Sequence, residues 1–408
     1  MNGTLLRSFL VFSIVISVFV PVSSAVNPLW IVSGPESGEL TTVVISQDGS
    51  TIVAGGDQLI TLSRDGKKLW TGWSGTKLVV SRDGNYILTT RDQNVRLISG
   101  SGRMLWDDHM DVPVKEVSMT PDASLILAGG ANIIRLIGQN GSAIRQNRTM
   151  PVMNHFRFFQ SGNGIVVTSQ NGIQTSNLTF FSNWTDTNMT QEYVETDAGD
   201  LSFVSVTNNR IRFYRLGENL DGTLEWEYAL PGGNALGFAW SRDGSTMVVG
   251  RDDNTVQALD RYGNLLWTDR ASHWVTSVAV SDDGNTIVAG SMDKTVTVYD
   301  RAGTKLGTAV LKNQIRSGSV AVSGDGSVIA AVDGSAAYGF SRSQFLQTVT
   351  TAETTAEPVI TVSGSPRTVE TIPPETSAVP QATQKAPADT SIVLAGLACL
   401  ALFCGRKI

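Results

Sequence analysis

Residues 275–306 read VTSVAVSDDGNTIVAGSMDKTVTVYDRAGTKL, and this stretch holds the whole pattern that decides the fold. Short apolar runs alternate with polar turns, which predicts four consecutive strands. The first turn, Ser281-Asp282-Asp283-Gly284, favours a tight hairpin because Gly, and to a lesser degree Asp, tolerates a positive φ. The predicted strands are residues 276–280, 286–289, 295–299 and 305–306.

The Ser-x-Asp-Gly turn recurs along the chain. Complete copies stand at residues 46–49, 81–84, 241–244, 281–284 and 323–326. Degenerate copies stand at Thr120-Pro121-Asp122-Ala123, at Ser161-Gly162-Asn163-Gly164 and, most weakly, near Gly199-Asp200. The spacing of about 40 residues is the length of one propeller blade. The sequence therefore predicts an all-β propeller of eight four-stranded blades, or of seven if the weakest copy merges with its neighbour.

The fourth strand of the unit repeatedly ends in Trp, after a turn that contains Gly. These residues are Trp70, Trp106, Trp226 and Trp267. Their regular place on the outer strand predicts packing between blades rather than a carbohydrate-binding platform. The Asp of each Ser-x-Asp-Gly turn is equally regular, which favours a role in the turn over calcium binding or catalysis.

The two ends of the array complement each other. The last copy runs through residues 336–340 and has no Leu-Trp strand, whereas Pro28–Val32 resembles an outer strand without a blade. Trp30 lies 40 residues before Trp70, in phase with the repeat. We expect Trp30 and its neighbours to complete the last blade and close the ring, which pairs edges that an open array exposes. The propeller then spans residues 27–345.

The repeats resemble WD repeats and quinoprotein-like propeller repeats over about 320 residues. The Gly-His pair of WD repeats is absent, and their Trp-Asp ending appears only as Tyr299-Asp300 or Leu259-Asp260. The Leu-Trp ending is closer to the quinoprotein type. Quinone-dependent dehydrogenases need a calcium-bound quinone with acidic and amide ligands, and no acidic cluster for it is seen. The resemblance therefore implies the fold, with no cofactor.

Charge and targeting segments indicate where the chain acts. A net charge of −6, with no run of Lys or Arg longer than two, argues against nucleic acid as a partner. Residues 1–25 are predicted to be a signal peptide, because Arg7 precedes the apolar run 9–20 and small residues end at Ala25. An uncleaved anchor is the alternative, although the run is short for a membrane span.

The C-terminal region changes composition sharply. Residues 346–389 are rich in Thr, Pro, Ser, Ala and Glu, which predicts an extended stalk. Residues 390–408 combine an apolar run with a basic end, which predicts a membrane anchor or a sorting signal. The two cysteines, Cys399 and Cys404, lie in this tail. Together the segments resemble those of archaeal and bacterial surface proteins, and whether the tail is retained or cleaved is open.

Five N-glycosylation sequons cluster in the least regular part of the repeat. Their acceptors are Asn140, Asn147, Asn177, Asn183 and Asn188. On an exported chain this density predicts an exposed, glycosylated face, and a polar loop rich in Asn and Thr is the alternative.

No catalytic, cofactor-binding or metal-binding constellation is evident. His109, His155 and His273 fall on different blades without the spacing of a metal site. The charged loops at 251–253 and 293–294 are interpreted as solvated or as turn caps. Two classes of function remain: a surface module that binds protein, glycan or envelope components, and an exported enzyme such as a quinoprotein, lyase or hydrolase. Three or more convergent His, Asp, Glu or Arg side chains at a channel mouth would favour the enzyme.

Overall fold

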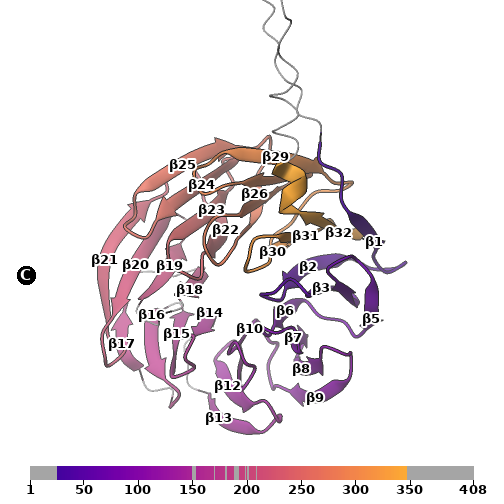
Figure 1. Ribbon diagram of the computed structural model, residues 1–408. Helices are drawn as coiled ribbons and strands as arrows, with labels where there is room; N and C mark the ends of the chain where they lie inside the picture. Colours follow the sequence, from indigo (N-terminus) through magenta and orange to yellow (C-terminus); the bar gives the residue numbers. More distant parts are fainter. Residues whose placement is uncertain are drawn as a thin grey trace, which may run out of the picture. The chain divides into compact units, whose positions relative to one another are not determined.

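The protein is an eight-bladed β-propeller (Figure 1). The computed structural model describes residues 25–346 except 149–152, 170, 180–181, 188–192, 198, 200–201 and 208. Within these residues, 32 strands form eight antiparallel four-stranded sheets around a central axis. The weakest sequence copy has a complete sheet of its own, so the alternative of seven blades is wrong. The predicted signal peptide up to residue 24, and the stalk and tail from 347 on, lie outside the described residues.

Each blade runs from an inner strand to an outer strand in chain order. Blade 1 consists of β2 (Leu40–Ile45), β3 (Thr51–Gly56), β4 (Leu59–Ser63) and β5 (Lys68–Gly72). Blade 2 consists of β6 (Lys77–Val80), β7 (Tyr86–Arg91), β8 (Asn94–Ser99) and β9 (Met104–His109). Blade 3 consists of β10 (Glu116–Met119), β11 (Leu125–Gly130), β12 (Ile133–Gly138) and β13 (Ala143–Asn147). Blade 4 consists of β14 (Met153–Phe158), β15 (Gly164–Ser169), β16 (Gly172–Asn177) and β17 (Ser182–Asp186).

The second half of the ring repeats this order, and only the last blade departs from it. Blade 5 consists of β18 (Tyr193–Thr196), β19 (Ser202–Thr207), β20 (Arg210–Leu216) and β21 (Gly222–Ala229). Blade 6 consists of β22 (Ala235–Trp240), β23 (Thr246–Arg251), β24 (Thr255–Asp260) and β25 (Leu265–Arg270). Blade 7 consists of β26 (Val275–Val280), β27 (Ile287–Ser291), β28 (Thr295–Tyr299) and β29 (Lys305–Val310). Blade 8 consists of β30 (Val320–Val322), β31 (Val328–Val332), β32 (Ala336–Ser341) and the N-terminal β1 (Trp30–Ser33).

The N-terminal strand closes the ring, as the sequence predicts. β1 pairs with β32 in a register that runs from Trp30 opposite Gly339 to Ser33 opposite Ala336. The strand begins at Trp30, two residues later than expected, and the backbone N–H of Leu29 adds a bond to the Gly339 carbonyl at 2.8 Å. The first and last parts of the chain are therefore held in one sheet.

The Ser-x-Asp-Gly turns owe their shape to a local hydrogen-bond network. The Ser46 hydroxyl donates to Asp48 Oδ1 at 2.7 Å, and that oxygen accepts the backbone N–H of Ser50 at 2.9 Å. The N–H of Thr51 in turn donates to Ser46 Oγ at 3.0 Å. The same Ser/Thr-to-Asp bond occurs at residues 81, 120, 241, 281 and 323. The predicted turn role of these aspartates is confirmed.

In blade 4 the turn lies two residues earlier than predicted. It runs from Phe159 to Gly162, whose N–H donates to the Phe159 carbonyl at 2.8 Å, and Gly162 has a φ of 72°. Phe159 takes the position of the turn Ser and is fully buried against Val194 and Phe203. Apolar packing of Phe159 replaces the hydroxyl hydrogen bond here. The Ser-x-Asp-Gly pattern therefore points to Ser161, two residues after the true start of the turn.

The outer-strand tryptophans of blades 1, 2, 4, 5, 6 and 8 each pack on the next blade, which confirms the predicted packing. The indole of Trp267 on β25 lies over Gly303 of blade 7, and its Nε1–H donates to the Arg301 carbonyl at 3.0 Å. Gly303 has a φ of 87°, and a Cβ there would lie 2.5 Å from Trp267 Cγ, so only Gly fits. Matching Trp–Gly joints are Trp30–Gly66, Trp70–Gly102, Trp106–Gly141, Trp184–Gly222 and Trp226–Gly263.

The charged loop at 251–253, interpreted as solvated or as a turn cap, contains a buried arginine. Arg251 is 2% exposed, and its guanidinium donates to the carbonyls of Pro231 at 2.6 Å and Gly233 at 3.1 Å. It also lies 3.2 Å from Asp253, which caps the turn by accepting the N–H of Thr255. Arg251 therefore fixes the loop that enters blade 6, whereas the predicted capping role holds for Asp253.

Candidate functional site

The inner strands surround a central channel of about 620 Å³. In blades 1 to 5 the residues four and two positions before the start of the turn line it, and in blades 6 and 7 the residue four positions before the turn does. Because side chains alternate along a strand, these two positions lie on the same face of the strand. Channel chemistry is therefore set by which residue each blade places at these two positions.

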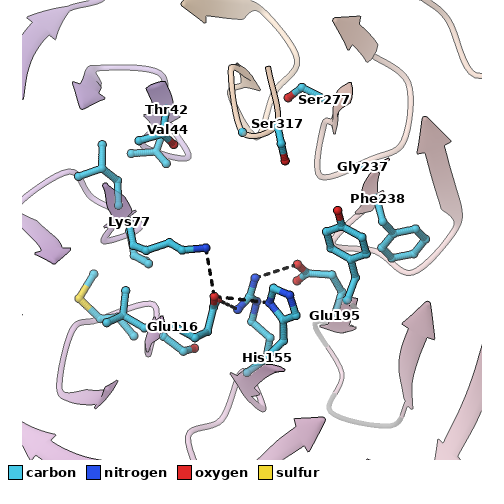
Figure 2. A pocket seen from close by; sticks show the side chains of 18 of the residues that line it. Thr42, Val44, Lys77, Glu116, His155, Glu195, Gly237, Phe238, Ser277 and Ser317 are labelled. Atoms are coloured by element: carbon cyan, nitrogen blue, oxygen red, sulfur yellow. Dashed lines mark hydrogen bonds and ion pairs between the residues drawn. The ribbon is translucent and has the colours of Figure 1, made fainter. Parts of the chain in front are cut away.

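Blades 2 to 5 place charged side chains on one side of the channel (Figure 2). Lys77 on β6 lies 3.6 Å from Glu116 on β10, joining Nζ to Oε2. Arg157 on β14 bridges two carboxylates, with nitrogens 2.5 Å from Glu116 and 3.4 Å from Glu195 on β18. His155 Nδ1 lies 3.5 Å from Glu116. We call these five residues the channel cluster.

Glu116 is the centre of the channel cluster. Its side chain is only 8% exposed, and burial by itself would raise its pKa. The charge of Arg157, followed by His155 and Lys77, outweighs that effect and lowers the pKa of Glu116 to about 2. Glu116 therefore stays ionised at neutral pH and is not a proton donor there.

The two ends of the channel cluster are more accessible than its centre. The Lys77 and Glu195 side chains are 48% and 36% exposed. His155 stacks on Tyr193, with ring centroids 5.5 Å apart and an interplanar angle of 21°. The cluster thus offers a cation at one end and a carboxylate beside an aromatic ring at the other.

The facing wall, from blades 6, 7, 8 and 1, is small and uncharged. Figure 2 shows Ser277 and Ser317 across the opening from Glu116, and Thr42 beside Lys77. Gly237 and Phe238 stand next to Glu195 on the side of blade 6. One wall therefore supplies charge, and the other supplies space and hydroxyl groups.

The structure separates the three histidines, and only His155 lies in the channel. His109 ends the outer strand β9, where Nδ1 is 3.3 Å from Asn94 Oδ1. His273 lies in the loop before β26, and its Nδ1 accepts the N–H of Trp274 at 2.8 Å. In the channel Glu116, Arg157 and Glu195 join His155, and this is the kind of convergence that the sequence analysis named as favouring an enzyme.

Other predicted features are placed as follows. Asn140 and Asn177 are exposed at turns of blades 3 and 4, and Asn147 is half-buried at the end of β13. Asn188 and the side chain of Asn183 lie outside the described residues. Among the residues described, no group of three His, Cys, Asp or Glu is arranged to hold a metal ion. No helix in this part of the chain is long and apolar enough to cross a membrane.

Eight four-stranded blades around an axial channel define a β-propeller. Residues 263–300 match the family model "WD domain, G-beta repeat". This segment ends at Tyr299-Asp300, where WD repeats carry Trp-Asp. The chain is thus a β-propeller in which one segment matches the model of a WD40 repeat. No curated protein matches it.

Solved WD40 propellers have the same architecture at low sequence identity. The C-terminal WD40 domain of Sif2 is 14% identical, with a TM-score of 0.65 over 78% of this chain and 98% of that one. Sqt1 of Saccharomyces cerevisiae is 11% identical, with a TM-score of 0.65 over 78% and 99%. Sqt1 of Chaetomium thermophilum, solved with the N-terminus of ribosomal protein L10, is 12% identical, with a TM-score of 0.64 over 78% and 100%. These likenesses show the fold.

Proposed function

We propose that this protein is a non-catalytic binding module that takes a segment of a partner protein at the channel mouth formed by the channel cluster. WD40 propellers typically act as protein-interaction scaffolds. The observation that carries the proposal is the two-ended charge of the cluster. Lys77 and Glu195 are accessible, while Glu116 and Arg157 between them neutralise each other.

A peptide suits this mouth better than a simple ion does. A peptide offers acceptors and donors along its length, so it can meet Lys77 at one end and Glu195 at the other. The Thr and Ser side chains of the facing wall can hydrogen-bond its backbone. Its side chains can pack on Tyr193 and Phe238, which line the same channel. The Sqt1 structure solved with the N-terminus of L10 supports a peptide as a ligand for this architecture.

Peptide selection tests the proposal while the partner is still unidentified. A displayed random library is selected on the wild-type protein, and the recovered peptides are titrated against Glu195→Gln and Lys77→Gln. The matched control is Glu225→Gln, because Glu225 also pairs with an arginine but lies on the outer strand β21. We expect affinity to fall at least tenfold in the channel variants and to stay unchanged in the control. Peptides that bind all variants equally would place the binding surface elsewhere.

An enzyme is the second candidate, favoured by the convergence of Glu116, His155, Arg157 and Glu195. His155 would be its proton-transfer group, since Glu116 stays ionised and Arg157 is held between two carboxylates. Incubation with pools of peptides and glycans, followed by mass spectrometry, tests this function. Turnover by the wild type that is lost in His155→Gln would establish an enzyme and overturn the binding module.

We also propose that the module is exported, glycosylated and tethered at the cell surface. The exposure of Asn140 and Asn177 supports glycosylation at two of the five sequons, while the composition of residues 1–25 and 346–408 supports export and anchoring. Glycopeptide mass spectrometry of the protein from its own cells, with fractionation of a chain truncated after residue 345, checks both parts. Unmodified sequons, or a truncated chain that stays on the surface, would contradict them.

A further inference from the structure

The end of the channel opposite the channel cluster is surrounded by a ring of turn residues. The second residue of each Ser-x-Asp-Gly turn, or of the turn in its place, lies there, and we call this ring the collar. Backbone hydrogen bonds link collar residues of neighbouring blades. The N–H of Gly324 donates to the Gln47 carbonyl at 2.8 Å, and the N–H of Gln47 donates to the Arg82 carbonyl at 3.1 Å. The N–H of Asp282 donates to the Gly324 carbonyl at 2.9 Å. The described collar residues are Gln47, Arg82, Pro121, Gln160, Arg242, Asp282 and Gly324.

The collar side chains enclose a cavity of about 250 Å³ and are unevenly charged. Arg82 donates through Nε to Gln47, and Gln47 donates through Nε2 to Asp282. Gly324 makes room for this link, since a Cβ there would meet both Gln47 and Asp282. Asp282 is thus bonded to a neutral amide and forms no ion pair within 4.0 Å with Arg82 or with Arg242 among the described residues.

Arg242 is the second arginine of the collar. It is half-buried, and the described part of the chain gives it neither a hydrogen bond nor an ion pair. Burial lowers its pKa, the positive charge of Arg82 lowers it further, and the negative charge of Asp282 acts in the opposite direction. A half-buried guanidinium keeps its charge. The described collar residues therefore include two cations and one carboxylate, which gives them a net positive charge.

We propose that the collar binds a small tetrahedral oxyanion, of the phosphate or sulfate type, between Arg82 and Arg242. The two arginines come from blades 2 and 6, which lie opposite each other in an eight-bladed ring. A tetrahedral anion presents oxygens on opposite sides and so meets both guanidinium groups, whereas the two oxygens of a carboxylate lie on one side. The site is independent of the peptide-binding mouth.

Calorimetric titration of the full-length protein with sodium phosphate tests the collar site. Sodium chloride at equal ionic strength controls for screening. We expect the wild type to bind one phosphate saturably and Arg242→Gln to bind it at least tenfold more weakly. Arg242→Lys should be weakened less, because Lys keeps the positive charge but loses the paired N–H donors of the guanidinium. The matched control Arg103→Gln, at an exposed turn arginine without a described side-chain partner, should bind as the wild type does.

Because the described part of the chain offers the Arg242 side chain no hydrogen bond or ion pair to lose, Arg242→Gln should remain folded, and its thermal unfolding in chloride checks this directly. Equal phosphate binding by Arg242→Gln, or an absence of saturable binding by the wild type, overturns the site. Stronger competition by sodium acetate than by sodium sulfate overturns its assignment to a tetrahedral anion.

Discussion

Removal of the Trp30 side chain tests whether β1 closes the ring as one cooperative structure. Trp30 lies over Gly66 of blade 1, and its Nε1–H donates to the Arg64 carbonyl at 3.1 Å. It also covers Gly339 of β32 within blade 8. Trp30→Ala therefore weakens the contact between the last blade and the first. Trp267→Ala is the matched control, because Trp267 makes the same kind of joint with Gly303 inside the array.

The size of the effect follows from burial. A Trp→Ala change in a core costs about 3–5 kcal/mol, and Trp30 is only half-buried, which reduces the packing loss. With about 1 kcal/mol for the lost hydrogen bond, we expect a loss of about 3 kcal/mol for Trp30→Ala. A similar or slightly larger loss is expected for Trp267→Ala, since that indole also packs on Tyr299 at 5.0 Å. Deletion of residues 26–34 removes β1 altogether and should cost more than either substitution.

Urea unfolding, followed by tryptophan fluorescence and by circular dichroism, measures these losses. In a closed ring both substitutions shift the midpoint by similar amounts, and the two probes report one transition. Deletion of residues 26–34 should lower the stability of the whole domain, because it exposes the edge of β32. The closure model fails if Trp30→Ala stays within about 0.5 kcal/mol of wild type, the range of ordinary surface substitutions, or if the deletion leaves unfolding unchanged.

Three further perturbations have defined outcomes. Gly303→Ala should lower the free energy of unfolding by about 2–3 kcal/mol, because it combines a φ of 87° with a clash against Trp267. Gly72→Ala, where the added Cβ meets open space, should be near neutral in the same urea assay. Arg251→Met should cost about 3 kcal/mol by leaving two carbonyls and Asp253 without their buried partner, and limited proteolysis should then cleave at residues 230–234. The pKa of Glu116 is lowered to about 2, against about 4.3 in an unfolded chain. The stabilisation that ionised Glu116 gives to the folded state is therefore complete above about pH 4.5 and is lost as the pH falls towards 2. Acid titration of the unfolding free energy should show this loss, of at most about 3 kcal/mol, in the wild type, and Glu116→Gln should lack it.

The fold was predictable because its signals are local and repeated. Asp-Gly turns and alternating apolar residues recur at a fixed spacing, so one well-formed copy at 275–306 explains the weaker ones. Closure by Trp30 was predictable for the same reason, since a strand missing at one end appears in phase at the other. The prediction failed where tertiary contacts replaced local ones. Phe159 replaces the turn hydroxyl by packing, and Arg251 is buried by the loop that enters blade 6, about 20 residues earlier in the chain, so neighbouring residues do not reveal either contact.

The channel cluster was missed although its signal is present in the sequence. Lys77, Glu116 and His155 are spaced 39 residues apart, and each lies four residues before the start of its turn. In a propeller, residues in the same phase of the repeat are neighbours around the axis, so charged residues in phase on an inner strand must meet in the channel. Placing the blade 4 turn two residues late moved His155 out of this phase and hid the convergence. The same rule assigns Arg82 and Arg242, each the first residue after the turn serine, to one collar, so phase within the repeat identifies both sites.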